Sequence, residues 1–116
     1  ALLVDDDRDI LAIAGGMLER LGYRVTSAGD GLEATQLFCR EPGAFDLVLL
    51  DMTMPRMDGP EALDLMRRAR PDIPVILSSG YPAESIVTDE LRRRTGGFLQ
   101  KPYRIEELQA VLAEVR

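Results

Sequence analysis

The sequence has little cysteine, little lysine and no long apolar run. Its 116 residues include one cysteine, Cys39, which excludes an internal disulfide and suits the cytosol. No apolar run approaches the roughly 18 residues that a membrane span needs, and no secretory signal opens the chain. We interpret Cys39, which follows Phe38 in a helix-like stretch, as a small core or boundary residue. These absences predict a cytoplasmic domain that makes no membrane contact.

Acidic residues outnumber basic ones, by 20 to 14. The net charge is −6, which argues against direct binding of nucleic acid. The arginine clusters at 67–70 and 92–94 fall where we expect helices to end, so we interpret them as partners of the helix dipole. Of the 14 basic side chains, Lys101 is the only lysine. A chain that otherwise avoids lysine therefore keeps one at the end of an expected strand.

Four short apolar runs are each followed by reactive polar residues, and helix-like segments separate them. Such runs are typical of buried parallel strands, and the length allows one domain with one core. The pattern predicts a doubly wound α/β domain with a five-stranded parallel sheet, flavodoxin-like order 2-1-3-4-5 and five helices. The expected strands are 2–4, 24–28, 46–50, 74–78 and 98–100, and the expected helices are 8–21, 32–40, 60–70, 83–93 and 104–115. Strand 24–28 has no reactive end residue, which favours a place near the sheet edge.

Carboxylates follow two of these strands. Because the carboxyl ends of parallel strands form one crevice, we expect Asp5, Asp6 and Asp51 to lie close together. Three such carboxylates repel one another unless a cation is present, and oxygen ligands suit Mg²⁺, with Mn²⁺ as the alternative ion. Asp7 is expected to cap the first helix and is left out of the site.

Asp51 differs from the other two carboxylates because it follows four consecutive apolar residues and precedes a rigid segment ending at Pro55. A carboxylate beside a metal can attack phosphorus and form an aspartyl phosphate. Lys101 would supply an ammonium, and Ser79 a hydroxyl, to the phosphoryl oxygens. The residues thus predict a site for phosphate and metal.

The chain resembles a receiver domain of two-component signalling, the phosphoacceptor module of response regulators and hybrid histidine kinases. The matching segments are 3–7, 51–59, Ser79 and Lys101-Pro102, in the family's order and spacing. The strings 77–82 and 98–103 look most like receivers of hybrid histidine kinases from bacteria. The resemblance covers the whole chain, and we expect residues 1–116 to be a single receiver domain cut from a longer protein.

The resemblance implies a role for each residue of the site. Asp51 accepts the phosphoryl group, Asp6 binds Mg²⁺ directly, and Asp5 acts mainly through water. The backbone carbonyl of Thr53 completes the protein ligands. Ser79 and Lys101 contact the phosphoryl group.

The resemblance also implies a conformational switch. Ser79 turns toward the phosphoryl group, Phe98 moves with it, and the bond between Lys101 and Pro102 is cis. The surface that responds comprises the helices 83–93 and 104–115 with strand 98–100, and it is also the expected face of a homodimer.

The implied partners are a histidine kinase or phosphotransfer domain, with a fused kinase or output domain as a further option. The domain would catalyse its own phosphorylation and dephosphorylation without being a turnover enzyme. Two alternatives stay open: a degenerate receiver that only docks proteins, and an aspartyl-phosphate phosphatase. Phosphatases of the haloacid dehalogenase type need an aspartate where this chain has Thr53, and degenerate receivers usually lack one of the acidic or lysine positions retained here.

Overall fold

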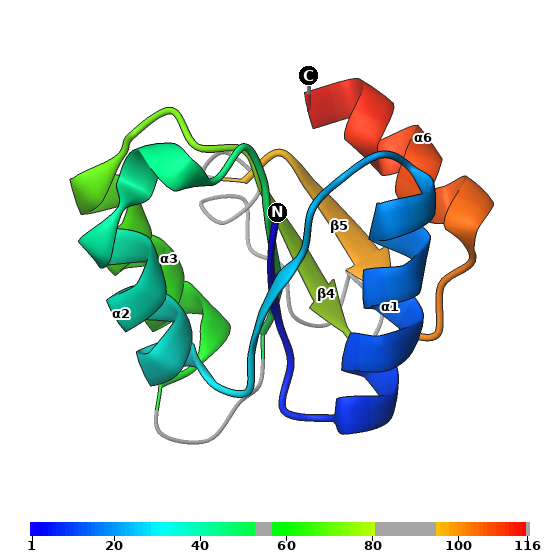
Figure 1. The fold of residues 1–116 in the computed structure, drawn as a ribbon, viewed down its shortest axis with the longest axis horizontal. Helices are drawn as coiled ribbons and strands as arrows, with labels where there is room; N and C mark the ends of the chain where they lie inside the picture. Colours follow the sequence, from blue (N-terminus) through cyan, green and yellow to red (C-terminus); the bar gives the residue numbers. More distant parts are fainter. Residues whose placement is uncertain (53–56, 81–94, 116) are drawn as a thin grey trace.

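The fold is a parallel β-sheet with helices on both faces, and the computed structural model describes it over residues 1–52, 57–80 and 95–115 (Figure 1). The sheet has five strands in the order β2-β1-β3-β4-β5, and every neighbouring pair is parallel. This order confirms the predicted flavodoxin-like sheet and puts β2 at an edge. The elements are β1 (Leu2–Val4), α1 (Arg8–Arg20), β2 (Thr26–Ala28), α2 (Gly31–Arg40), η1 (Pro42–Ala44), β3 (Val48–Asp51), α3 (Gly59–Ala69), β4 (Val75–Ser79), β5 (Gly97–Gln100) and α6 (Ile105–Val115).

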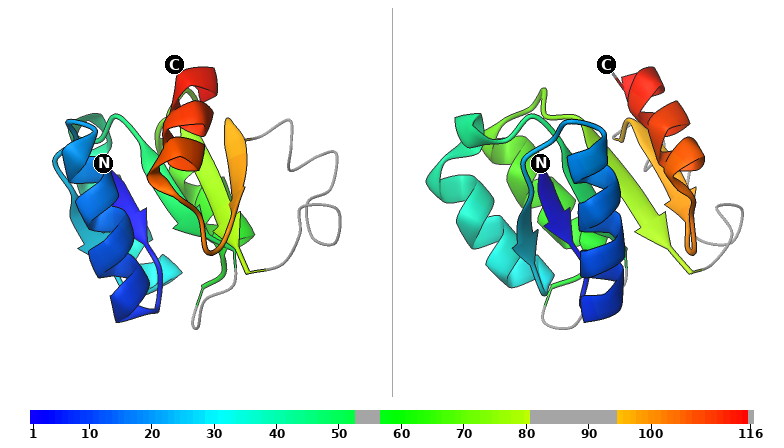
Figure 2. Two further views of the ribbon diagram at one scale, coloured as in Figure 1. Left: turned by 90° about the vertical axis from the view of Figure 1, so that its right-hand side faces the viewer. Right: turned by 45° about the vertical axis from the view of Figure 1, so that its right-hand side comes forward.

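Two apolar layers hold the helices to the sheet. Helices α2 and α3 cover one face, and α1 and α6 cover the other (Figures 1 and 2). On β1, Leu2 and Val4 join the core beneath α2 and α3, whereas Leu3 joins the core beneath α1 and α6. This alternation is the two-residue period of a strand, and burial of both faces explains the continuous apolar runs in β1, β3 and β4.

Aspartate side chains fix the starts of three helices. Asp7 accepts hydrogen bonds from the amides of Asp9 (2.9 Å) and Ile10 (3.4 Å), and Asp30 accepts one from the amide of Glu33 (2.8 Å). Asp58 caps α3, where Pro60 lies in the first turn. Each side chain satisfies amides that the first helical turn leaves without a partner. The predicted cap of the first helix is therefore confirmed.

The strand boundaries differ from the predicted ones by one or two residues at several ends. Strand β2 begins at Thr26 rather than at residue 24, because only residues 26–28 pair with β1. Asp51 is the last residue of β3 and Ser79 the last residue of β4. Both side chains are thus held on strands rather than on loops. The expected helix 83–93 lies outside the described residues.

The interpretation of Cys39 as a core or boundary residue is wrong, since its side chain is exposed. Phe38, the preceding residue, is fully buried. Consecutive residues on an α-helix point about 100° apart, so burial of Phe38 turns its neighbour outward.

None of the helices in the described ranges combines the length and the apolar character that crossing a lipid bilayer requires.

Candidate functional site

The candidate site lies where the strand order reverses, between β1 and β3. Val4 pairs with Leu50, so the next residue of each strand, Asp5 and Asp51, lies side by side at the carboxyl edge. Open α/β sheets bind ligands at this position. The crevice there has a volume of about 540 Å³. It is lined by Asp5, Asp6, Asp7, Arg8, Ile10, Asp51, Ser79, Gly80 and Lys101.

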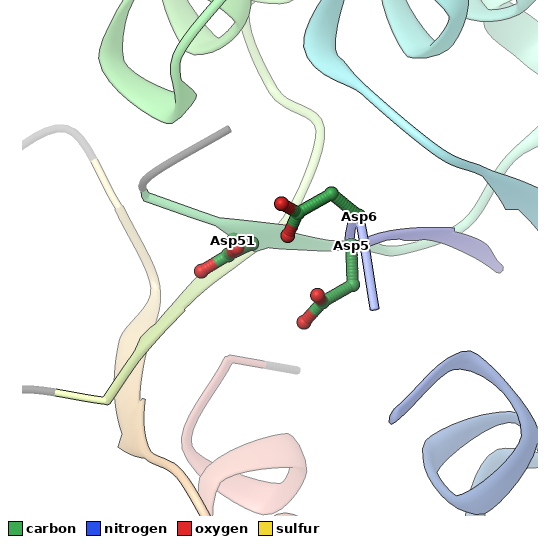
Figure 3. A group of neighbouring side chains, drawn as sticks. All are labelled: Asp5, Asp6 and Asp51. Atoms are coloured by element: carbon green, nitrogen blue, oxygen red, sulfur yellow. The ribbon is translucent and has the colours of Figure 1, made fainter. Parts of the chain in front are cut away.

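The three predicted carboxylates converge on one space beyond the strand ends (Figure 3). One carboxylate oxygen from each of Asp5, Asp6 and Asp51 lies within 4.8 Å of the others. Asp5 and Asp51 are buried, at 1% and 3% exposure, whereas Asp6 is exposed. In proteins, Mg²⁺ usually binds one or two carboxylates and keeps several of its water ligands. The crevice offers carboxylate oxygens with room beside them for water. The residues present therefore fit a magnesium ion.

Lys101 lies between the two buried carboxylates. Its Nζ is 3.0 Å from Asp5 Oδ2 and 3.2 Å from Asp51 Oδ1. Burial alone would lower the pKa of Lys101, but the hydrogen bond to Asp5 and the charges of Asp51 and Asp5 outweigh it and raise that pKa. Three carboxylates against one ammonium leave two negative charges in the cluster. A divalent cation would balance them.

The amide of Asp7 is a part of the site that the sequence did not reveal. The Asp7 carboxylate caps α1, as predicted, but its backbone N–H donates to Asp5 Oδ1 at 3.0 Å. With Lys101 on Oδ2, both Asp5 oxygens have a protein donor. The turn into α1 therefore fixes the orientation of Asp5. Residue types alone carry no signal for this backbone contact.

Ser79 and Phe98 lie on the neighbouring strands β4 and β5, and Ser79 is close to the acidic cluster. Ser79 is buried at the end of β4 and lines the crevice, and its carbonyl accepts a hydrogen bond of 2.7 Å from the Lys101 amide. Phe98 is half-buried on β5, opposite Leu77, and packs against the core beneath α2 and α3. The Lys101–Pro102 bond is cis. Thr53 lies outside the described residues.

A second, apolar groove adjoins the crevice and was not predicted. It has a volume of about 340 Å³. Its walls are Ile10, Ile13, Ala14, Met17, Gly80, Lys101, Pro102 and Tyr103. Ile13 is 61% exposed, and among the described residues no other large apolar side chain is exposed. The signal was available in the sequence, since Ile13 falls outside the apolar stripe that α1 turns toward the core.

Tyr103 forms part of this groove, and the charges of the acidic cluster affect the pKa of its hydroxyl. Its burial, followed by the charges of Asp5 and Asp51, raises the pKa of its hydroxyl to about 12. The phenol therefore stays neutral, and the groove remains apolar beside a charged crevice.

Comparison with known proteins identifies the family. The protein-family model for the response regulator receiver domain matches residues 1–113. The chain therefore belongs to the receiver domains of two-component signalling. Among curated proteins, the sensor kinase CckA of Brucella abortus is 33% identical over 115 residues, covering 98% of this chain and 12% of the kinase. The transcriptional regulatory protein ZraR of Klebsiella oxytoca is 37% identical over 113 residues, covering 97% of this chain and 25% of the regulator.

Solved structures agree with this assignment. The CheX-CheY-BeF3-Mg complex of Borrelia burgdorferi aligns with a TM-score of 0.90 at 28% identity, covering 98% of this chain and 86% of that chain. TrrA of Thermotoga maritima, solved with Mg²⁺ and BeF, aligns with a TM-score of 0.86 at 28% identity over 99% and 96% of the two chains. The chain spans a quarter or less of the two curated relatives, whose other activities do not transfer to it.

Proposed function

We propose that Asp51 accepts a phosphoryl group from the phosphohistidine of a histidine kinase or phosphotransfer domain. The observation that carries this proposal is the position of Lys101 between two buried carboxylates, beside a third that is exposed. In the transfer, a carboxylate oxygen of Asp51 forms a bond to phosphorus as the bond from phosphorus to the imidazole nitrogen breaks. Phosphoryl transfer asks the protein mainly for positioning and for charge neutralisation, and the described residues offer both.

The proposed roles of the other polar residues follow from their contacts. Mg²⁺, when bound, would neutralise the charge that gathers on the phosphoryl oxygens. Asp6 and Asp51 would hold it, together with the carbonyl of Thr53, whereas Asp5 would act through water because its oxygens already accept from Asp7 and Lys101. Lys101 would move from Asp51 to a phosphoryl oxygen. Mn²⁺ would replace Mg²⁺ in the same oxygen-rich site.

The switch is proposed to begin at Ser79. Its hydroxyl would bond a phosphoryl oxygen, and Phe98 on the adjacent strand would follow it inward. Burial of Ser79 and half-burial of Phe98 on paired strands support this coupling. The surface that would respond, and that would also serve a homodimer, includes the segment 83–93 outside the described residues.

The apolar groove is the proposed docking surface for the phosphodonor protein. It shares Ile10, Gly80 and Lys101 with the acidic crevice, so a protein bound there would bring its histidine close to Asp51. A small phosphodonor needs no such contact. Whether the parent protein is a hybrid kinase or a regulator with an output domain is a separate proposal, and similarity to both a sensor kinase and a transcriptional regulator supports either.

Phosphate acceptance is tested with acetyl phosphate and Mg²⁺. We expect intact-mass measurement to show one added phosphoryl group on the wild type and none on Asp51→Asn. Failure of the wild type to gain this group would leave a docking-only domain as the better description. Sustained hydrolysis of p-nitrophenyl phosphate over many turnovers would instead indicate a phosphatase.

The docking surface is tested with Ile13→Ser, with Ala12→Ser on the exposed side of α1 as the matched control. Using a histidine phosphotransfer domain that phosphorylates the wild type, we expect Ile13→Ser to slow transfer severalfold. Phosphorylation by acetyl phosphate should stay unchanged, as should both rates in Ala12→Ser. Equal transfer rates in the two variants would remove the groove from the proposal.

A further inference from the structure

The backbone next to Asp51 is held by two hydrogen bonds of Met52, the residue that follows it. The Met52 amide donates to the Ser78 carbonyl at 2.9 Å, which fixes the first residue after Asp51 to β4. The Gly59 amide donates to the Met52 carbonyl at 3.0 Å, which ties the start of α3 to the same residue. Movement of the segment 57–59 would therefore be transmitted to Met52 and to Asp51.

Two glycines allow unusually close backbone contacts in this region. A Cβ at Gly59 would lie 2.6 Å from the Asp51 carbonyl oxygen and 2.7 Å from Met52 Cα. A Cβ at Gly31, the first residue of α2, would overlap the carbonyl oxygen of Met57 and lie 3.1 Å from Met57 Cβ. These are mostly contacts with backbone, which cannot rotate away as a long side chain can. The first turn of α2 thus packs directly against the segment 57–59.

Thr35 reinforces the same contact one turn further along α2. Its side chain is buried, and its Oγ1 donates to the Gly31 carbonyl at 2.7 Å and lies 3.4 Å from Met57 Sδ. The Asp30 cap fixes the start of the helix through the Glu33 amide. Helix α2 therefore offers a rigid support to Met57, although none of its residues lines the acidic crevice.

We propose that Gly31 and Thr35 are positioning residues for the acceptor Asp51. The packing of α2 against Met57 sets the position of Gly59 and, through the hydrogen bond to Met52, the backbone that carries Asp51. Neither residue touches the reacting atoms. The inference rests on the proposed function only for the phosphorylation rate, because the geometry of the carboxylate cluster also sets the affinity for Mg²⁺.

The first test compares Gly31→Ala with Gly16→Ala, whose added Cβ on α1 would have nothing within 4 Å. The readouts are the Mg²⁺ dissociation constant from amide chemical shifts, the rate of phosphorylation by acetyl phosphate, and the melting temperature. We expect Gly31→Ala to weaken Mg²⁺ binding and slow phosphorylation, each by about tenfold, since displacements of about 1 Å can cost up to 100-fold in rate. Gly16→Ala should leave both unchanged. Wild-type affinity and rate in folded Gly31→Ala would overturn the proposal.

The second test keeps the question decidable if Gly31→Ala does not fold. Thr35→Val removes the hydroxyl at nearly constant shape, whereas Thr35→Ser keeps it. We expect Thr35→Val to weaken Mg²⁺ binding severalfold, and Thr35→Ser to bind Mg²⁺ with nearly the wild-type affinity. If both variants lower only the melting temperature, Thr35 is merely structural and the proposal fails. A wild type that binds Mg²⁺ but takes no phosphoryl group would defeat the proposed function, while the Mg²⁺ affinities would still decide the role of α2.

Discussion

Half-buried cations lie near both ends of β3 and β4, but the two ends use them differently. At the carboxyl edge, Lys101 meets the carboxylates of Asp5 and Asp51. At the amino edge, guanidinium groups from the end of α3 meet backbone carbonyls. Arg70 donates to Pro42 (3.2 Å) and Phe45, just before β3, and Arg67 donates to Pro71 (2.9 Å) and Ile73, just before β4.

The two edges differ in the charge of the groups that the cations contact. Arg70 and Arg67 each donate to two backbone carbonyls, which carry no net charge, and Arg70 also pairs with Asp72 at 3.2 Å. Burial even lowers the pKa of Arg67, with Asp72 opposing that shift. The carboxyl edge keeps more negative than positive charge in a small space. We infer that the arginines at the amino edge fasten loops to the sheet. The carboxyl edge, in contrast, is kept for binding a cation and a phosphoryl group.

Replacing the cation at the carboxyl edge should give the largest effect on function. We expect Lys101→Met to slow phosphorylation by acetyl phosphate by about 10²- to 10³-fold, the usual cost of losing one donor to a developing charge. The rate is measured by intact mass over time at saturating Mg²⁺. A rate within threefold of the wild type would show that Lys101 serves only to neutralise the unphosphorylated cluster.

Magnesium should stabilise the fold through the same edge. A ligand that binds only the folded state at 100 times its dissociation constant adds about 2.7 kcal/mol to the free energy of unfolding. We expect millimolar Mg²⁺ to raise the melting temperature of the wild type and of Arg70→Met equally. Asp51→Asn should respond much less. A response that Arg70→Met loses, or that Asp51→Asn retains in full, would break the distinction between the two edges.

Replacing the cation at the amino edge should affect stability instead. Arg70→Met leaves the partly buried carbonyls of Pro42 and Phe45 without this donor, and we expect the free energy of unfolding to fall by about 1 kcal/mol, the low end of the cost of an unsatisfied buried polar group. The decrease in the free energy of unfolding is measured by urea unfolding. The phosphorylation rate of the folded variant should stay within twofold of the wild type, and a tenfold loss would mean that the amino edge also shapes the site.

The comparison also shows which features the sequence could predict. Strand order and the grouping of Asp5, Asp51 and Lys101 follow from short-range patterns, because each of these residues lies at the carboxyl end of a strand and parallel strands align those ends. Helix caps are equally local, since Asp7 and Asp30 bond amides two or three residues away.

Long-range backbone contacts could not be predicted in the same way. The arginines at 67–70 were interpreted as partners of the helix dipole, yet Arg70 reaches the carbonyl of Phe45, 25 residues away. The approach of Gly31 to Met57 joins α2 to a distant loop. Both depend on how loops pack once the sheet has formed, and glycine or arginine at one position does not encode the partner. Thr53 and the expected helix 83–93 stay predictions.

The smallest expected effect concerns pH and the groove beside the carboxyl edge. The pKa of Tyr103 is raised to about 12, because burial and the charges of Asp5 and Asp51 disfavour the phenolate. The unfolded chain loses this proton near its ordinary pKa of about 10, so the contribution of Tyr103 to stability is fully present below that pH. It is lost progressively as the pH rises toward 12, and at pH 11 the loss should be about 1 kcal/mol. The check is urea unfolding of the wild type and Tyr103→Phe at pH 8 and pH 11, with the wild type expected to lose more. Lys101, whose pKa is also raised, weakens both proteins alike in this window, so an equal loss in the two would show that folding does not raise the pKa of Tyr103.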